Sequence, residues 1–305
     1  MSNAPFNRYA GLIIIQATMS NPNGDPDMES EPRMRDLDGL GIISPPSVKR
    51  KYRDLVDESV VIDEAQSILN LDKSDNEFNI LEKRGRDRSE ITALSTEEFK
   101  QQYWDARLFG NTFLESIKKI EDKAAKKKAE DRRDNGELEH LINTGVLQMG
   151  VGLSVAPIQI ERMTFTNKSG VEAGKDRGMA PLAFRVVTHG IYCIPFYINP
   201  SVAIKTGATK EDVDLFQFIT PHIYAHTTSA IRPNIDILHA WCAEHKSPLG
   251  SCPEHLLMSA LKPKLKDGVT NPSSIDDYVI PTLDDLGDLQ QRFKSIEDLT
   301  LKQWN

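Results

Sequence analysis

The chain has few cysteines and no long run of apolar residues. Only Cys193, Cys242 and Cys252 occur among its 305 residues, and such an odd, low count is typical of a reducing compartment without a disulfide framework. No apolar run approaches the length of a membrane span, and the N-terminus shows no charged region followed by an apolar stretch, as a signal peptide would. We therefore expect a cytoplasmic protein that does not contact a membrane.

The sequence also lacks the common signatures of catalysis and nucleotide binding. It contains no G-x-S-x-G nucleophile motif, no P-loop and no G-x-G-x-x-G after a predicted strand. The aromatic signature of an RNA recognition motif is absent as well. These absences favour a protein that is not an enzyme, and they predict that any bound RNA is held by loops and a helix, without stacking on a sheet.

An excess of positive charge is missing too. The chain has 45 acidic and 37 basic residues, a formal net charge of -8, whereas a free-standing nucleic-acid binder is usually basic. A polyanion would therefore have to be held by locally clustered cations. The length fits one large domain or two small ones, with a core that needs no disulfide or metal to stabilise it.

The most informative segment lies near the N-terminus. A buried strand is expected over residues 8–20, and the rigid polar turn Asn21-Pro-Asn-Gly-Asp-Pro-Asp27 follows it. A helix is expected from Ser47, as its cap, to about Glu58. This helix carries four cations that would clamp successive phosphates without reading sequence, or that would simply form a solvated face. The four cations are Lys49, Arg50, Lys51 and Arg53.

Two clusters raise the question of a metal. Carboxylates crowd the loop after the first strand, where they would hold Mg²⁺ or would cap local backbone groups, and their spacing misses the calcium-loop pattern. A C-x₂-H…C-x₂-H array near residue 250 has ligands suited to zinc, although packing histidines are favoured. We expect neither a metal nor another cofactor. The clusters are Asp25, Asp27, Glu29 and Glu31, and Cys242, His245, Cys252 and His255.

The rest of the chain alternates between helical and strand patterns. The expected order is strand, basic helix, insertion, strands, helix and strand, which favours an α+β sandwich with helices on one face of an antiparallel sheet. The acidic, turn-rich tail from Lys262 is expected to be a short docking extension. The expected segments are an insertion at 59–100, helices at 96–108, 117–140 and 209–225, and strands within 144–165 and 184–198.

Several of these motifs together resemble the backbone subunit of type I CRISPR Cascade complexes, a repeat-associated (RAMP) family. The turn at 21–27, Gly41-Ile-Ile-Ser44 and Val48-Lys-Arg-Lys-Tyr-Arg53 carry the resemblance, and Asp105-Ala-Arg-Leu-Phe-Gly110 looks like the family's D-x-R-x-F-G. The resemblance spans about residues 8–260 and is closest to subtype I-C. Weaker motifs follow in the family's order: Thr144–Gln148, Gly152–Ser154, His189–Tyr192, Thr228–Arg232 and His245–His255.

The resemblance implies a fold with a right-hand shape and an assembly. A ferredoxin-like (modified RRM) palm over 8–260 would carry a helical finger insertion at 59–100 and a thumb loop at 166–183, and 261–305 would be an acidic C-terminal extension. Copies would polymerise along the CRISPR guide RNA (crRNA) beside other Cascade subunits. Each thumb would displace a base through Met179 or Leu182, and the guide would pair with target DNA.

The resemblance also implies roles for particular residues. The four cations of the basic helix would contact guide phosphates, and Asn21 and Asn23 would shape the turn beside them. An alternative comes from type III relatives, which cut RNA with an acidic residue in this loop, so that Asp25 or Asp27 would serve a metal-dependent endonuclease. Further expected RNA neighbours are Arg107 and Gly110, which would let the guide approach the palm, then Gln148, Ser154 and Arg232, and Lys175, Arg177 and Met179 in the thumb.

Overall fold

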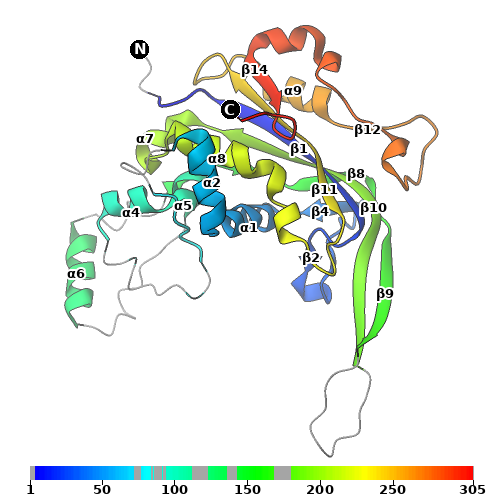
Figure 1. Cartoon of the computed structure of the whole chain (residues 1–305), viewed down its shortest axis with the longest axis horizontal. Helices are drawn as coiled ribbons and strands as arrows, with labels where there is room; N and C mark the ends of the chain where they lie inside the picture. The colour runs from blue at the N-terminus through cyan, green and yellow to red at the C-terminus, as the bar shows by residue number, and fades with distance from the viewer. Residues whose placement is uncertain are drawn as a thin grey trace, which may run out of the picture.

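The computed structural model describes residues 4–71, 77–83, 85, 91, 94–111, 123–135, 143–167 and 180–304. Its centre is an antiparallel sheet of eight strands in the order β14-β11-β1-β10-β8-β4, with β7 and β9 also paired to β10 (Figure 1). The mixed α+β architecture expected from the sequence is confirmed. The strands of this sheet are β1 (Tyr9–Ser20), β4 (Leu40–Ile43), β7 (Leu147–Met149), β8 (Gly152–Pro157), β9 (Ile160–Asn167), β10 (Ala180–Ile198), β11 (Ile235–His245) and β14 (Phe293–Asp298).

Strand β1 lies in the middle of the sheet and is buried on both faces. Successive side chains of a strand point to opposite faces, so Ile13 and Ile15 enter one core while Leu12 and Ile14 enter the other. This explains why the strand reads as a continuous apolar run. Its neighbours are β10 and β11, both antiparallel to it.

Helices cover the first face of the sheet (Figure 1). Helix α1 begins at Pro45 with Ser44 at the N-cap, so the expected cap at Ser47 is wrong. Proline suits the first helical turn because its missing N–H would have had no partner there. The buried face of α1 agrees with the predicted apolar pattern, and Tyr52 stacks on Phe216 with 4.9 Å between ring centroids. The larger helices are α1 (Pro45–Val56), α2 (Ser59–Leu69), α4 (Thr96–Gln102), α5 (Trp104–Phe109), α6 (Lys123–Asp134), α8 (Lys210–Ile219) and α9 (Glu254–Leu261).

Short elements connect these parts. The expected loop between residues 21 and 46 contains two small strands and a 3₁₀ turn before β4, and the expected helix at 209–225 ends at Ile219 and continues as 3₁₀ turns. The short elements are β2 (Gly24–Asp25), η1 (Pro26–Met28), β3 (Glu31–Pro32), β5 (Gly110–Asn111), β6 (Asn143–Thr144), η4 (Pro200–Val202), α7 (Ala203–Thr206), η5 (Thr220–His222), η6 (Ala225–Thr227), β12 (Lys264–Leu265), η7 (Ile275–Asp277), β13 (Tyr278–Val279) and η8 (Asp284–Arg292).

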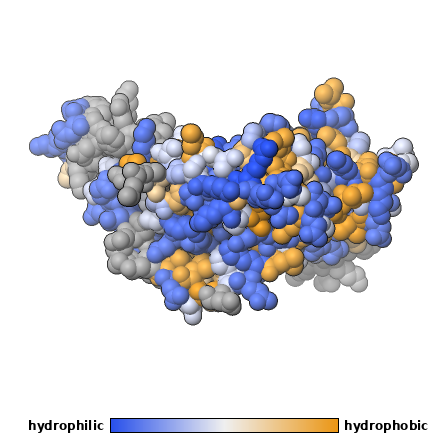
Figure 2. All heavy atoms as spheres, turned by 90° about the horizontal axis from the view of Figure 1, so that it is seen from above, coloured by the Kyte–Doolittle hydropathy of each residue, from blue (hydrophilic) through white to orange (hydrophobic). Residues whose placement is uncertain are grey.

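The C-terminal segment covers the second face. The tail was expected to be a docking extension, but Tyr278, Leu286 and Phe293 are buried in the second core, and β14 pairs with β11 at the edge of the sheet. The apolar residues of this segment are separated by turns, so neither helical nor strand periodicity revealed them. Seen from above, the molecule is largely hydrophilic, with scattered apolar patches (Figure 2).

A long hairpin leaves the sheet at one end. Strands β9 and β10 pair from Ile160↔Val187 to Asn167↔Ala180 and project away from the body (Figure 1). The expected thumb residues Lys175, Arg177 and Met179 lie outside the described residues, and Leu182 is placed only as a position within β10. Among the described residues, no helix is long and apolar enough to cross a membrane.

Candidate nucleic-acid interface

Asn21 connects four segments at the end of β1. It is only 2% exposed. Its backbone N–H donates to the carbonyl of Ile231 at 2.8 Å, and its Nδ2 donates to the carbonyls of Ser30 at 2.7 Å and Arg185 at 3.2 Å. An amide side chain suits this position because it offers two donors on one short stem. The predicted role of Asn21 in shaping the turn agrees with these bonds.

Asn23 ties the same turn to the basic helix. Its Oδ1 accepts a hydrogen bond from the backbone N–H of Ser44 at 2.7 Å, and Ser44 is the N-cap of α1. The turn therefore fixes where α1 starts relative to β1. RNA contact by Asn21 or Asn23 themselves stays a prediction.

Lys51 is a buried cation without a carboxylate partner in the described part of the chain. Its Nζ donates to Thr227 Oγ1 at 2.8 Å and lies 4.6 Å from the centre of the Tyr224 ring. Burial first, and then the nearby charge of Arg232, lowers the pKa of Lys51 to about 8, whereas Asp54 acts in the opposite direction. Two cations close together with no paired anion are unfavourable, so this site favours an anionic ligand. The expected neighbour Arg232 thus lies beside the basic helix.

Lys49 and Arg50 are half-buried on the same helix. The Nζ of Lys49 lies 5.4 Å from the centre of the Phe109 ring, and burial, followed by the charge of Arg53, lowers its pKa. Arg50 forms an ion pair with Asp54 at 2.6 Å. This pair has the four-residue spacing that brings side chains together on a helix, so Arg50 fits the solvated-face alternative better than Lys51 does.

Arg53 and Arg107 are neutralised inside the protein. Arg53 Nε is 2.7 Å from Asp105 Oδ2, and both side chains are buried. Arg107 and Asp212 are fully buried, and the guanidinium also donates to three backbone carbonyls. Both arginines are therefore held by the fold, and we expect neither of them to contact RNA. The carboxylate partners lie 52 and 105 residues away, beyond any local pattern.

Three other expected RNA neighbours have local structural roles. Gly110 has a φ of 81°, which favours glycine, and it ends α5 and pairs with Thr144. Ser154 is buried, and its Oγ accepts from the Gly41 N–H at 2.8 Å. Gln148 is exposed on β7, and among the described residues its side chain bonds only the nearby carbonyl of Gly145. Gly110 and Ser154 are therefore explained by the fold, and an RNA contact by Gln148 stays a prediction.

The acidic loop is paired with arginines. Asp25 Oδ2 lies 3.1 Å from Arg33 NH1, and Glu29 Oε2 lies 2.9 Å from Arg185 NH2. Asp25 also accepts from the backbone N–H of Asp27 at 3.1 Å, which is the local capping alternative of the sequence analysis. Within the described ranges, no three His, Cys, Asp or Glu residues are arranged to hold a metal ion.

The first half of the C-x₂-H…C-x₂-H array, Cys242 and His245, is engaged in packing, whereas His255 is exposed. Cys242 Sγ accepts from Gln217 Nε2 at 3.6 Å, and His245 Nδ1 accepts from the Ser251 N–H at 3.0 Å. His245 also packs its ring against Phe293, with centroids 4.9 Å apart. These contacts fit the packing interpretation.

The structure adds cationic neighbours that the sequence analysis missed. Arg185 lies on β10 where the hairpin leaves the body, and Arg33 lies just after β3. Arg185 stands among apolar residues typical of a strand, and Thr227 directly precedes the motif Thr228–Arg232. None of these residues carries a local signal of its own, because only the tertiary fold brings Arg185 to Asn21 and Thr227 to Lys51.

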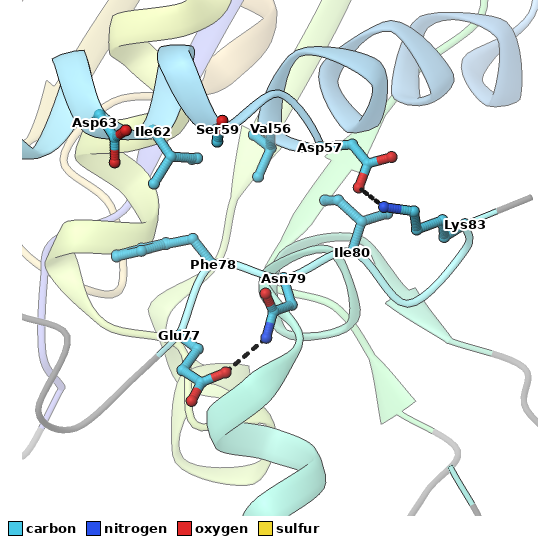
Figure 3. Close-up of a pocket in the computed structure, with 10 residues that line it drawn as sticks. All are labelled: Val56, Asp57, Ser59, Ile62, Asp63, Glu77, Phe78, Asn79, Ile80 and Lys83. Atoms are coloured by element: carbon cyan, nitrogen blue, oxygen red, sulfur yellow. Dashed lines mark hydrogen bonds and ion pairs between the residues drawn. The ribbon is translucent and has the colours of Figure 1, made fainter. Parts of the chain in front are cut away.

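A hollow of about 430 Å³ lies between the α1–α2 junction and residues 77–83 (Figure 3). Its walls are apolar at Ile62 and Phe78, and its rim includes Asp63 and Glu77. The carboxylates make this hollow unsuited to phosphate, so the cations around Asn21 form the candidate interface.

Comparison with known proteins agrees with the resemblance. The sequence model of the family described as CRISPR-associated protein Cas7 matches residues 7–283. The chain belongs to the Cas7 family. No curated protein matches it.

Solved structures similar to this Cas7-family chain share little sequence with it. One, "CRISPR RNA-guided surveillance complex, pre-nicking", has 15% identity and a TM-score of 0.41, with 77% of this chain and 78% of that chain covered. A "CRISPR RNA-guided surveillance complex" has 16% identity, a TM-score of 0.38 and coverages of 85% and 78%. A "Type III-B Cmr-beta bound to cognate target RNA" has 9% identity, a TM-score of 0.40 and coverages of 78% and 61%.

Proposed function

We propose that this chain is a guide-binding backbone subunit of a type I Cascade complex, closest to subtype I-C, that acts in the cytoplasm. The observation that carries the proposal is the pair formed by Lys51 and Arg232, two neighbouring cations without a carboxylate partner in the described part of the chain. Lys51 Nζ bonds only the Thr227 hydroxyl there, and Arg232 Nε is buried without a hydrogen-bond partner among the described residues. A phosphate of a single-stranded guide would neutralise both. Family membership supports the same role, because the matched region includes the whole of this cluster.

The topology supports the palm of the proposed hand. The order β11-β1-β10-β8, with α1 between β1 and β8 and α8 between β10 and β11, is that of a ferredoxin-like unit. In the proposal, the projecting β9–β10 hairpin is the thumb and the region from α2 to α4 contributes to the fingers. Copies of the chain polymerise along the crRNA together with other Cascade subunits, and the guide pairs with target DNA.

The proposed subunit is not an enzyme. Asp25 is occupied by Arg33 and by a backbone N–H, which supports a structural role for this carboxylate. We therefore expect Asp25→Ala to leave the length of bound RNA unchanged with and without Mg²⁺. Mg²⁺-dependent cleavage that this substitution abolishes would favour the endonuclease alternative.

The test is the RNA content of the chain after co-expression with a CRISPR array. The wild-type chain should elute as a large particle that contains RNA of discrete length. Lys49→Glu with Lys51→Glu should lose this RNA, whereas Lys205→Glu with Lys266→Glu, an equal charge change at exposed positions, should retain it. Lys51→Met serves as a second variant if charge reversal impairs folding. A wild-type chain without RNA, even with the other subunits present, would contradict the proposal.

A further inference from the structure

Ion pairs hold the loop after β1 against the base of the projecting β9–β10 hairpin. Arg185 on β10 lies 2.9 Å from Glu29 and 4.0 Å from Glu31, and β3 packs beside β10. Arg33 pairs with Asp25 at 3.1 Å. Three carboxylates of an acidic loop thus act as counter-ions for two arginines, next to the candidate interface.

We propose that Arg33 and Arg185 are further phosphate-binding residues, and that Asp25, Glu29 and Glu31 occupy them until RNA displaces these carboxylates. The proposal rests on the proposed function and extends its site from α1 to the base of the hairpin. The loop then lowers the affinity of the free chain for RNA. Arginine suits the exchange because its planar donors match carboxylate and phosphate equally well.

Continuity with the first cluster supports this extension. The backbone N–H of Asn21 bonds Ile231, the residue before Arg232, while its side chain bonds the carbonyl of Arg185. Asn21 therefore joins the segment that carries Arg232 to the strand that carries Arg185. A single strand that crosses Asn21 would pass both segments.

The exposure of these pairs makes exchange feasible. The side chain of Glu29 is 82% exposed and that of Arg185 is 27% exposed, so water screens their attraction and the pair is weak. The buried pair of Arg107 and Asp212 has no such access. In addition, Arg33 Nε is buried and has no hydrogen-bond partner among the described residues, so Asp25 satisfies this guanidinium only in part.

The backbone of the loop is also held in a less favourable conformation. Glu29 and Ser30 have positive φ values of 49° and 62°, which side chains other than glycine rarely adopt. Asn21 Nδ2 holds the Ser30 carbonyl at 2.7 Å, so the strained turn keeps Glu29 facing Arg185. Release of the Glu29–Arg185 ion pair needs only movement of the exposed Glu29 side chain, and it leaves the hydrogen bond from Asn21 to Ser30 intact.

The experiment is a mutant cycle on the full chain, with fluorescently labelled single-stranded oligouridine as the probe. Glu29→Gln with Glu31→Gln should tighten binding by about three- to ten-fold, because each exposed pair contributes a factor of up to about five. In an Arg185→Gln background the same two substitutions should leave the dissociation constant nearly unchanged, because the arginine that the glutamates occupy is gone. Asp284→Asn with Asp288→Asn removes equal charge from exposed positions in the C-terminal segment and should leave affinity unchanged.

The outcomes separate the two proposals. Equal tightening with and without Arg185, or with the control pair, would show a non-specific charge effect and overturn the exchange. Unchanged affinity on neutralising the loop, while Lys51→Met still weakens binding, would overturn the exchange and leave the proposed function standing. A wild-type chain that binds neither oligouridine nor guide RNA would contradict both.

Discussion

Two residues apart on one helix, Lys51 and Arg53 have the same degree of burial and opposite surroundings. Both are about 95% buried, at 4% and 5% exposure. Arg53 forms an ion pair with the buried carboxylate of Asp105. Lys51 instead contacts the Thr227 hydroxyl and the Tyr224 ring, and a second cation, Arg232, lies nearby. We therefore expect the presence of a counter-ion, and not burial, to separate structural cations from ligand-binding ones.

The largest effect is expected on the free energy of unfolding when Arg107, the most completely paired of these cations, is replaced. Arg107→Ala leaves Asp212 buried without its partner, and breaking a buried pair in this way costs about 3–5 kcal/mol. Urea unfolding followed by circular dichroism would measure the loss. Lys205→Ala is the control, because Lys205 is exposed. An unchanged unfolding midpoint together with a specific loss of RNA binding would reverse our assignment of Arg107.

Next in size is the loss of RNA affinity in Lys51→Met. A charge-assisted hydrogen bond contributes about 1.5–3 kcal/mol, so the dissociation constant should rise about ten- to hundred-fold. The free energy of unfolding should stay equal or rise, because burial disfavours the charge that methionine removes. Filter binding and urea unfolding on the same preparation check both parts, and unchanged RNA affinity would remove Lys51 from the interface.

The pH dependence of RNA binding is a third and smaller effect. The pKa of Lys51 is about 8 in the free chain, and a bound phosphate would raise it. RNA affinity should therefore be highest below about pH 8. Above that pH it should fall by at most about tenfold per pH unit, until the pKa of Lys51 in the RNA-bound state is reached.

Lys51→Arg is the control for this pH profile. Arginine stays charged over the whole range, so the fall above about pH 8 should disappear. Binding titrations on either side of that pH provide the measurement. A profile with the same slope in both proteins would assign the titration to another group.

The smallest effect is expected for Arg50, whose ion pair with Asp54 is partly exposed. Arg50→Gln should change the free energy of unfolding by no more than about 0.5 kcal/mol, as for other helix pairs at this spacing. RNA affinity should fall only a few-fold, because Asp54 already screens this cation. If Arg50→Gln lost as much RNA affinity as Lys51→Met, ion pairing would not separate structural cations from ligand-binding ones.

Local patterns predicted much of this fold. The continuous apolar run of β1, the apolar face of α1 and the capping box at the start of α8 all follow from residues close in the sequence. In that capping box, Thr209 and Asp212 bond each other's backbone. The C-terminal cover was missed because its apolar residues are separated by turns and are buried only against the sheet.

The candidate site shows the same limit more sharply. Asn21 and Lys51 were identified because they belong to a turn and to a cationic helix. Their partners could not be identified in this way: Thr227 lies 176 residues from Lys51, and Asp105 lies 52 residues from Arg53. A run of like charges thus shows where cations are, and only the tertiary structure shows which of them keep a free charge.

The most direct measurement compares Lys51→Met with Arg53→Met, two residues apart on one helix and almost equally buried. For each variant, the RNA dissociation constant and the free energy of unfolding would be measured on the same preparation. Our account predicts that Lys51→Met loses RNA affinity and keeps its stability, and that Arg53→Met loses about 3–5 kcal/mol while its folded fraction binds RNA as the wild type does. Equal losses of RNA affinity at equal stability in both variants would contradict it.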